Sequence, residues 1–325
     1  MLIITNELDV HADAVTRELH TRGVSVFRFH PEDFPHKCSI SMEIRDGSIR
    51  GKLMNEHGGV AFEDICAAWY RQPQRLFPGI NMTSAKLGDY VKAQSTLTLL
   101  ALYHCLQTFW VGDHYKLRRA NIKALQLIEA SKAGLNTPDT LISSDPAAVA
   151  GFVERLGDAE CAIKPLLALG VSNEHSYRLP LTTTLPKGLP LDSVAYAPNI
   201  FQPYINKEAE LRCVVMGERI FAAKIISQAS DKTRKDWRGG ECQHEIYTLP
   251  SSVEASIHRM MDSFEINFAS LDMILTPEGE YVFLELNPNG QWLWLEEELG
   301  IPLVASMADL LMTPLRARKP DGTAV

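Results

Sequence analysis

Residues 271–298 of this chain read LDMILTPEGEYVFLELNPNGQWLWLEEE and contain the most informative local pattern of the sequence. Two apolar runs, 271–275 and 281–286, flank the sequence Pro-Glu-Gly-Glu at 277–280, which is typical of a turn. Short apolar runs joined by such a turn predict a β-hairpin. Polar side chains inside these runs need partners where they are buried, so they are the first candidates for a functional site.

Three oxygen-bearing side chains of the hairpin are predicted to meet on one face. Glu285 and Asn287 are two residues apart, so on a strand they point the same way, and Asp272 can join them from the partner strand. Two carboxylates and a carboxamide suit Mg²⁺ better than Zn²⁺, and Mg²⁺ bound in this way usually serves phosphates. The alternative is that Asp272 and Glu285 belong to a solvated face of the hairpin. The position of Glu285 between Leu284 and Leu286 favours the metal.

Composition and charge limit the function classes. The chain has 325 residues, a net charge of −8, and 46% hydrophobic and 22% charged residues, as in ordinary soluble globular proteins. The acidic balance predicts no nucleic-acid partner. The six cysteines show neither a CxxC pair nor a zinc-ligand spacing, which indicates reduced thiols in a cytoplasmic compartment. No signal peptide is recognised, and the apolar segment 97–110 is too short to span a bilayer, so no membrane partner is expected.

The order of predicted elements indicates a mixed α/β (α+β) protein. Residues 1–115 form an N-terminal α/β unit, residues 116–198 a central unit, residues 199–315 a C-terminal unit with the hairpin, and residues 316–325 a tail. The predicted elements of the first unit are strands at 2–4, 24–29 and 67–71, a helix after Asp9, a hairpin around Asp46-Gly47 and a helix over 84–110.

The two later units each combine helices with strands. The central unit is predicted to contain a helix from Asn121, a helix with Pro146 at its first position, the strand 161–169, and a loop with a small hairpin over 179–198. The C-terminal unit is predicted to contain strands at 200–205, 211–217 and 219–226, a charged loop at 231–240, helices at 251–263 and 303–312, and the hairpin.

Several polar residues in the last two units suit a nucleotide. Lys164 lies inside an apolar strand and needs an anion at its ammonium, unless it snorkels from the strand end. Residues 201–205 (FQPYI) end a strand and can offer backbone groups to an adenine edge, although most such segments only connect elements. Glu210 and Arg212 lie two apart on one strand side, where they can hold ribose and phosphate; the alternative is a surface ion pair.

Four cations crowd the loop at 231–240, which reads DKTRKDWRGG. In an otherwise acidic chain, such a cluster predicts a clamp for phosphate or carboxylate, and the alternative is a solvated loop. Lys224 precedes this loop as a further cation. Trp292 and Trp294 are expected to pack beneath the hairpin, whereas residues 69–71 (WYR) are candidates for the substrate side of a cleft.

In this order of residues the chain resembles the ATP-grasp family of carboxylate–amine ligases. The resemblance covers most of residues 116–312, and residues 1–115 resemble the α/β domain that precedes the ATP-grasp fold in that family. The resemblance implies ATP held between two α+β subdomains. One departure is the run KPLLALGVSN at 164–173, which has only one glycine where the family commonly has a glycine-rich phosphate loop. The implied site comprises metal ligands Asp272, Glu285 and Asn287, nucleotide contacts Lys123, Lys164, Gln202, Pro203, Tyr204, Glu210 and Lys224, and catalytic arginines Arg212 and Arg238.

Within this superfamily the chain resembles the graspetide, or microviridin-type, peptide ligases. The likeness lies in residues 69–71, 121–140, 236–238 (DWR) and 285–296 (ELNPNGQWLWLE). It implies that ATP, with Mg²⁺ or alternatively Mn²⁺, activates Asp or Glu side chains of a precursor peptide as acyl-phosphates. Ser/Thr hydroxyls or Lys amines then form esters or amides, and the enzyme is expected to be a homodimer. The alternatives are a ligase that adds an amino acid to a peptide, protein or small acid, and a non-catalytic ATP-binding scaffold.

Overall fold

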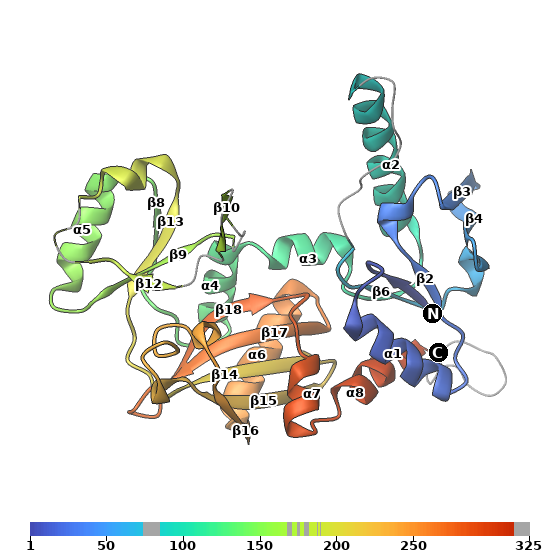
Figure 1. The fold of residues 1–325 in the computed structure, drawn as a ribbon. Coiled ribbons are helices and arrows are strands. Elements are labelled where there is room, and N and C mark those ends of the chain that lie inside the picture. The colour runs from blue at the N-terminus through green and yellow to red at the C-terminus, as the bar shows by residue number, and fades with distance from the viewer. Residues whose placement is uncertain are drawn as a thin grey trace.

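The computed structural model describes residues 1–73, 85–167, 171–173, 176–178, 182–186, 188 and 190–314. The chain forms an N-terminal α/β unit, a small central sheet and a larger C-terminal sheet, as Figure 1 shows. The mixed α/β class predicted from the sequence is confirmed. The predicted tail from residue 316 lies outside the described residues. Within the described part of the chain, no helix combines the length and apolarity needed to cross a membrane.

The N-terminal unit contains a parallel sheet of order β2-β1-β6-β7 and an antiparallel sheet of order β3-β4-β5. The side chain of Asp9 caps α1 by accepting from two backbone N–H groups, as the sequence predicts. Asp46 and Gly47 have positive φ at the predicted hairpin turn. The helix predicted over 84–110 is too long, because Phe109–Val111 forms an edge strand. The elements are β1 (Leu2–Ile4), α1 (Val10–Thr21), β2 (Phe27–Phe29), β3 (Cys38–Arg45), β4 (Ser48–Asn55), β5 (Gly58–Ala61), β6 (Ala67–Tyr70), α2 (Ala85–Cys105) and β7 (Phe109–Val111).

The central sheet has the order β12-β9-β13-β8. The strand at 199–203 was predicted to open the C-terminal unit, but it pairs with β9 and β8, so the break between the sheets falls after it. The predicted hairpin at 179–198 falls partly outside the described residues, and a two-stranded ribbon precedes it. The elements are α3 (His114–Ala120), α4 (Lys123–Lys132), β8 (Leu141–Ser143), α5 (Pro146–Leu156), β9 (Cys161–Pro165), β10 (Val171–Asn173), β11 (Ser176–Arg178), β12 (Thr183–Thr184) and β13 (Asn199–Pro203).

The C-terminal sheet is antiparallel, with the order β16-β15-β14-β17-β18. Apart from the strand at 199–203, the strands, helices and hairpin predicted for this unit are present. The sequence did not reveal the short α7 or β16, whose sequence QHEIY begins with three polar residues. The elements are β14 (Ala209–Met216), β15 (Arg219–Ile226), β16 (Gln243–Tyr247), α6 (Ser251–Phe264), β17 (Phe268–Leu275), β18 (Tyr281–Asn287), α7 (Leu293–Leu299) and α8 (Leu303–Leu311).

Strand β14 is buried along its whole length, and its two faces have different neighbours. Leu211, Cys213 and Val215 pack in the core that also contains α6 residues, whereas Val214 and Met216 pack in the core with α1 and α8. Because side chains alternate along a strand, Glu210 and Arg212 share the face of Val214. This face is covered at one end by α8 and is open at the other, where the cleft begins.

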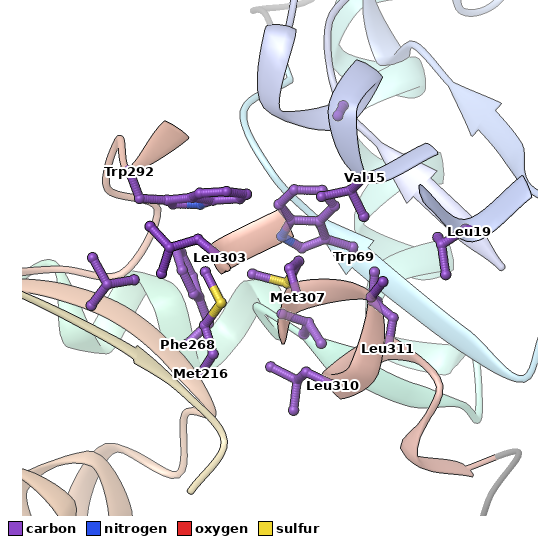
Figure 2. Packing of buried hydrophobic residues seen from close by; sticks show 14 of the residues in the cluster. Val15, Leu19, Trp69, Met216, Phe268, Trp292, Leu303, Met307, Leu310 and Leu311 are labelled. Atoms are coloured by element: carbon purple, nitrogen blue, oxygen red, sulfur yellow. The ribbon is translucent and has the colours of Figure 1, made fainter. Parts of the chain in front are cut away.

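The core shared by α1, α8 and the C-terminal sheet joins the first unit to the third. Figure 2 shows Val15 and Trp69 of the N-terminal unit in one cluster with Trp292 and Met307 of the C-terminal unit. All four side chains are fully buried. Two tryptophans buried in one cluster give this junction a large apolar area. Trp69 is therefore a core residue, and the prediction that it lines the substrate side of a cleft is wrong.

Candidate active site

A cleft of about 750 Å³ lies between the central sheet and the C-terminal sheet. Its walls come from β9 and β13 on one side, from β14, β17 and β18 on the other, and from the N-terminus of α4. Residues predicted from the sequence to form one site are brought together here. They are Lys123, Lys164, Gln202, Pro203, Tyr204, Glu210, Arg212, Arg238, Asp272, Glu285 and Asn287.

The three predicted metal ligands meet on the floor of the cleft. Asp272 of β17 is directly opposite Glu285 of β18 in the strand register. The Asn287 amide nitrogen lies 3.2 Å from Glu285 Oε1 and 3.4 Å from Asp272 Oδ2. The pairing predicted from the hairpin sequence therefore brings both carboxylates within hydrogen-bonding reach of the carboxamide.

A register shift between Asp272 and Met273 completes this arrangement. Met273 is opposite Phe283, so Leu284 is the extra residue of a β-bulge. Both Leu284 and Glu285 line the cleft as a result. Bulges of this kind commonly redirect side chains next to active sites, and here the bulge aims the Glu285 carboxylate across the strand pair.

Two cations neutralise this acidic floor. Lys123, the first residue of α4, forms an ion pair with Glu285. Arg212 donates from Nη1 to Asp272 Oδ1 over 2.7 Å. Burial alone would raise the pKa of Glu285, but Lys123 and the Asn287 amide lower this pKa to about 2. Burial and the neighbouring Glu285 carboxylate raise the pKa of Asp272.

We expect Lys123→Met to lower the free energy of unfolding most strongly near neutral pH. The pKa of Glu285 in the folded protein, about 2, lies below its ordinary value of 4.5. The Lys123–Glu285 pair therefore stabilises the fold above pH 4.5, and this contribution is lost as the pH falls toward 2. Urea unfolding of both proteins between pH 7 and pH 3 measures the difference, which should shrink with acidification. A difference independent of pH would contradict this account.

The donor set fits a hard divalent cation. The set consists of two carboxylates, Asp272 and Glu285, and one amide, Asn287. Elsewhere in the described chain, no three His, Cys, Asp or Glu side chains come together as a metal site. Carboxylate and amide oxygens are the ligands that Mg²⁺ prefers, and Mg²⁺ commonly takes few protein ligands besides the phosphates of its substrate. Asp272, Glu285 and Asn287 are therefore the residues that would hold Mg²⁺.

The opposite end of the cleft has the features of a nucleoside site. Gln202 is buried at the end of β13 and donates to Thr140 Oγ1 over 2.9 Å. Tyr204 follows it, and its backbone N–H bonds to Glu160 O over 2.7 Å. Glu210 is buried beside them, and burial raises its pKa although Lys207 Nζ lies 2.6 Å from its Oε1. Lys207 is a cleft residue that the sequence analysis missed, because a lysine after a predicted strand carries no distinguishing pattern.

Lys164 lies on β9, facing the cleft, as the apolar strand around it predicts. Among the described residues no hydrogen-bond or ion-pair partner meets its ammonium, and burial lowers its pKa. A half-buried ammonium without a partner lowers the stability of the ligand-free protein. A bound phosphate would supply the missing negative charge.

We therefore expect Lys164→Met to raise the melting temperature of the empty protein while weakening ADP binding by roughly 10–100-fold, the range for losing a hydrogen bond to a charged group. Thermal unfolding with and without ADP measures both effects. Unchanged ADP affinity would exclude Lys164 from the phosphate site.

The basic loop reaches the cleft through Arg238. This arginine makes a two-pronged contact with Asp236, from Nε and Nη2 over 2.8 Å each. Asp236 is buried and also accepts from the backbone N–H of Thr182, so it fixes the loop against the central unit. The side-chain bonds to Asp236 raise the pKa of Arg238 further above its ordinary value. Trp237 stacks near Trp294 of α7 with 5.5 Å between ring centroids, and both tryptophans line the cleft.

Lys224 does not lie in this cleft. It pairs opposite Leu211 in the register of β15 and β14, so it lies on the sheet face opposite to Arg212. Its ammonium forms an ion pair with Glu208 over 2.5 Å. The position of Lys224 in the sequence predicted a contact with the nucleotide. The sheet face on which its side chain lies depends on the register between β14 and β15, which the sequence does not show.

Gln126 and Arg71 hold the walls of the cleft together. The sequence did not single out Gln126, whereas it predicted Arg71, within residues 69–71, for the substrate side of the cleft. Gln126 of α4 is buried and makes two bonds with the backbone of Leu286, over 2.8 and 3.0 Å. This contact places Lys123, one turn earlier, over Glu285. Arg71 is fully buried and donates to Asn289 O and Gln291 Oε1, so it contacts the cleft wall from behind.

Comparison with known proteins agrees with this geometry. Residues 1–118 match the family model of the MvdD pre-ATP grasp domain. A RiPP-associated ATP-grasp ligase of Chryseobacterium gregarium, solved with ADP and a leader and core peptide, has a TM-score of 0.89 and 28% identity over 95% of both chains. Macrocyclase MdnC of Microcystis aeruginosa, solved with precursor peptide MdnA, has a TM-score of 0.84 and 27% identity over 96% of this chain and 98% of that chain.

A curated relative is the probable alpha-L-glutamate ligase 1 of Shewanella frigidimarina, which is 25% identical over 200 residues, 59% of this chain. The match spans 63% of the length of that relative. The likeness to the RiPP-associated ligases, by contrast, extends over nearly the whole of both chains. Together with the cleft between the two sheets, these similarities indicate an ATP-dependent ligase that has the ATP-grasp fold and is similar to the RiPP-associated ligases.

Proposed function

We propose that this protein uses ATP to activate Asp or Glu side-chain carboxylates of a ribosomal precursor peptide as acyl-phosphates. It then joins them to Ser or Thr hydroxyls as esters, or to Lys amines as amides. The observation that carries the proposal is the floor of the cleft, where Asp272, Glu285 and Asn287 meet beside Lys123 and Arg212. The likeness to a ligase solved with ADP and a peptide supports it.

The reaction consists of two transfers. A peptide carboxylate oxygen attacks the γ-phosphorus of ATP, the bond to the β-phosphate oxygen breaks, and ADP leaves. A hydroxyl or amine then attacks the acyl carbon, the bond to the phosphate oxygen breaks, and phosphate leaves with the proton passing to solvent. Each link therefore removes one water from the peptide, and one ATP becomes ADP and phosphate.

The chain contributes binding, orientation and charge to both steps. Gln202 and Tyr204 would border the adenine, Glu210 would hold the ribose, and Lys164 and Lys123 would meet phosphates. Asp272, Glu285 and Asn287 would hold Mg²⁺, which would supply positive charge to neutralise the transferring phosphate. Phosphoryl transfer needs little covalent chemistry from the protein, so positioning of this kind accounts for most of the catalysis.

Arg212 and Arg238 are the residues best placed to meet the reacting carboxylate. Both line the cleft next to the metal ligands. The buried Nε of Arg212 and the buried Oδ1 of Asn289 have no hydrogen-bond partner among the described residues. Buried polar atoms are rarely left unpaired, so these two atoms would bind a ligand in the loaded enzyme.

The proposal includes Mg²⁺ as the metal, with Mn²⁺ as the alternative. It also includes a homodimer and a cytoplasmic location.

Mass spectrometry of the peptide tests the proposed function. A candidate precursor peptide with Asp or Glu and Ser, Thr or Lys side chains is incubated with enzyme, ATP and Mg²⁺, and the expected product has lost one water per link. A second candidate is a ligase that adds a free amino acid, which the likeness to the probable alpha-L-glutamate ligase favours. That reaction would increase the mass of the acceptor instead. Nucleotide binding without product from any acceptor would indicate a non-catalytic scaffold.

A further inference from the structure

A histidine outside the cleft holds the segment that follows the metal ligands. His11 lies in the first turn of α1 and is only 4% exposed. Its Nε2 accepts hydrogen bonds from the backbone N–H groups of Trp292 and Leu293, each over 3.1 Å. Its ring also meets the Trp292 indole edge-on, with 4.9 Å between centroids. The start of α7 is thus bonded to the N-terminal unit.

Asp9 keeps this histidine in the form that can accept. Its Oδ1 lies 3.5 Å from His11 Nδ1, and its Oδ2 accepts from the Thr5 hydroxyl over 2.6 Å. A ring nitrogen that accepts two N–H groups carries no proton, so the proton of the neutral imidazole belongs on Nδ1, toward Asp9. Burial lowers the pKa of His11, which agrees with a neutral ring.

Arg71 adds a second connection between the same units. Its Nε lies 3.7 Å from Asp9 Oδ2, and its Nη1 donates to Asn289 O over 2.5 Å. Its Nη2 donates to Gln291 Oε1 over 3.1 Å. Arg71 therefore holds this segment at residues 289 and 291, and His11 holds it at residues 292 and 293. Neither side chain lines the cleft.

The opposite side of this segment contacts the metal site. Gln291 O accepts from Arg212 Nη2 over 2.8 Å, while Nη1 of the same arginine donates to Asp272. The segment also has no room to shift toward the sheet, because a Cβ at Gly290 would lie 2.6 Å from Ser270 Oγ and 3.0 Å from Arg212 Nη2. A displacement of residues 289–293 would therefore move the guanidinium that orients the Asp272 carboxylate.

We infer that Asp9, His11 and Arg71 are positioning residues, which fix residues 289–293 and through them hold Arg212 and Asp272 in place for metal-bound nucleotide. The inference rests on the proposed function in that the nucleotide binds at this site. It assigns the N-terminal unit a part in catalysis, although His11 touches no reacting group. Partners that orient metal ligands typically change metal affinity or activity by about 10–100-fold when removed.

Three variants separate positioning from a merely structural contribution. His11→Leu removes the acceptor for the two N–H groups. His11→Gln restores an acceptor at the place of Nε2. Val15→Ala, one turn along the same helix face, removes buried apolar volume from the same core but leaves His11 and its hydrogen bonds to residues 292 and 293 in place. Calorimetry measures ADP binding to each full-length protein with and without Mg²⁺, and hydrogen–deuterium exchange follows residues 288–295.

We expect His11→Leu to reduce the Mg²⁺-dependent gain in ADP affinity by about 10–100-fold. ADP affinity without Mg²⁺ should stay as in the native protein, and the amides of residues 292 and 293 should exchange faster. His11→Gln should restore both properties, and Val15→Ala should keep them although its melting temperature falls.

The inference is overturned if His11→Leu keeps the full Mg²⁺ effect, or if Val15→Ala loses it equally. These binding measurements need no peptide. A native protein that gains ADP affinity with Mg²⁺ but joins no peptide would refute the ligation proposal alone.

Discussion

Glu285→Gln should reduce peptide-dependent ADP formation by roughly 10²–10³-fold, the range observed when one group that stabilises developing charge is removed. The carboxylate of Glu285 is opposite Asp272 on the cleft floor and stays ionised, since Lys123 and Asn287 lower its pKa to about 2. Glutamine keeps the shape of the side chain but offers the cation a neutral amide. ADP release and the Mg²⁺ dependence of ADP binding measure the loss.

A matched control is available on the same hairpin. Glu278 lies exposed in the turn between β17 and β18, and its change to Gln removes the same charge far from the cleft floor. Glu278→Gln should retain native activity. If Glu285→Gln were as active as Glu278→Gln, Glu285 could not be a metal ligand.

Arg212→Ala should abolish ligation, with a loss on the order of 10³-fold or more, comparable to the removal of an arginine that stabilises a phosphoryl-transfer transition state. Arg212 is buried and bridges Asp272 and the backbone of Gln291, so its guanidinium is fixed at the cleft floor. Arg212→Lys should recover little activity, because an ammonium cannot make the two directed contacts of the guanidinium.

Product yield by mass spectrometry and far-UV circular dichroism measure activity and fold in parallel. Arg219→Ala is the control, since Arg219 of β15 is bound to Asp309 and Ser306 away from the cleft. A folded Arg212→Ala protein that yields native amounts of product would refute the role of Arg212.

The metal floor could be predicted from the sequence because it depends on local rules. The turn at 277–280 fixes the hairpin, and the two-residue period of a strand places Glu285 and Asn287 together. The observed pairing of Asp272 with Glu285 agrees with that expectation. The bulge at Leu284 could not be predicted, since it depends on how the two strands fit against α4 and the rest of the sheet.

Features that depend on long-range pairing were beyond sequence reasoning. The strand at 199–203 pairs with β9 and β8, and no local pattern shows which sheet it joins. Lys224 was assigned to the nucleotide site from its order in the chain, whereas its register places it on the opposite face. Arg71 directly follows strand β6 of the first unit, yet its guanidinium contacts Asn289 more than 200 residues later.

Anomalous scattering from Mn²⁺ in crystals grown with ADP would locate the metal site and the nucleotide in one experiment. Mn²⁺ substitutes for Mg²⁺ at oxygen ligands, so its anomalous peak marks the metal position. We expect a peak bound by Asp272, Glu285 and Asn287, with the ADP phosphates on its open side and the adenine beside Gln202 and Tyr204. A peak elsewhere in the protein, or ADP bound outside the cleft that contains Lys164, would contradict it.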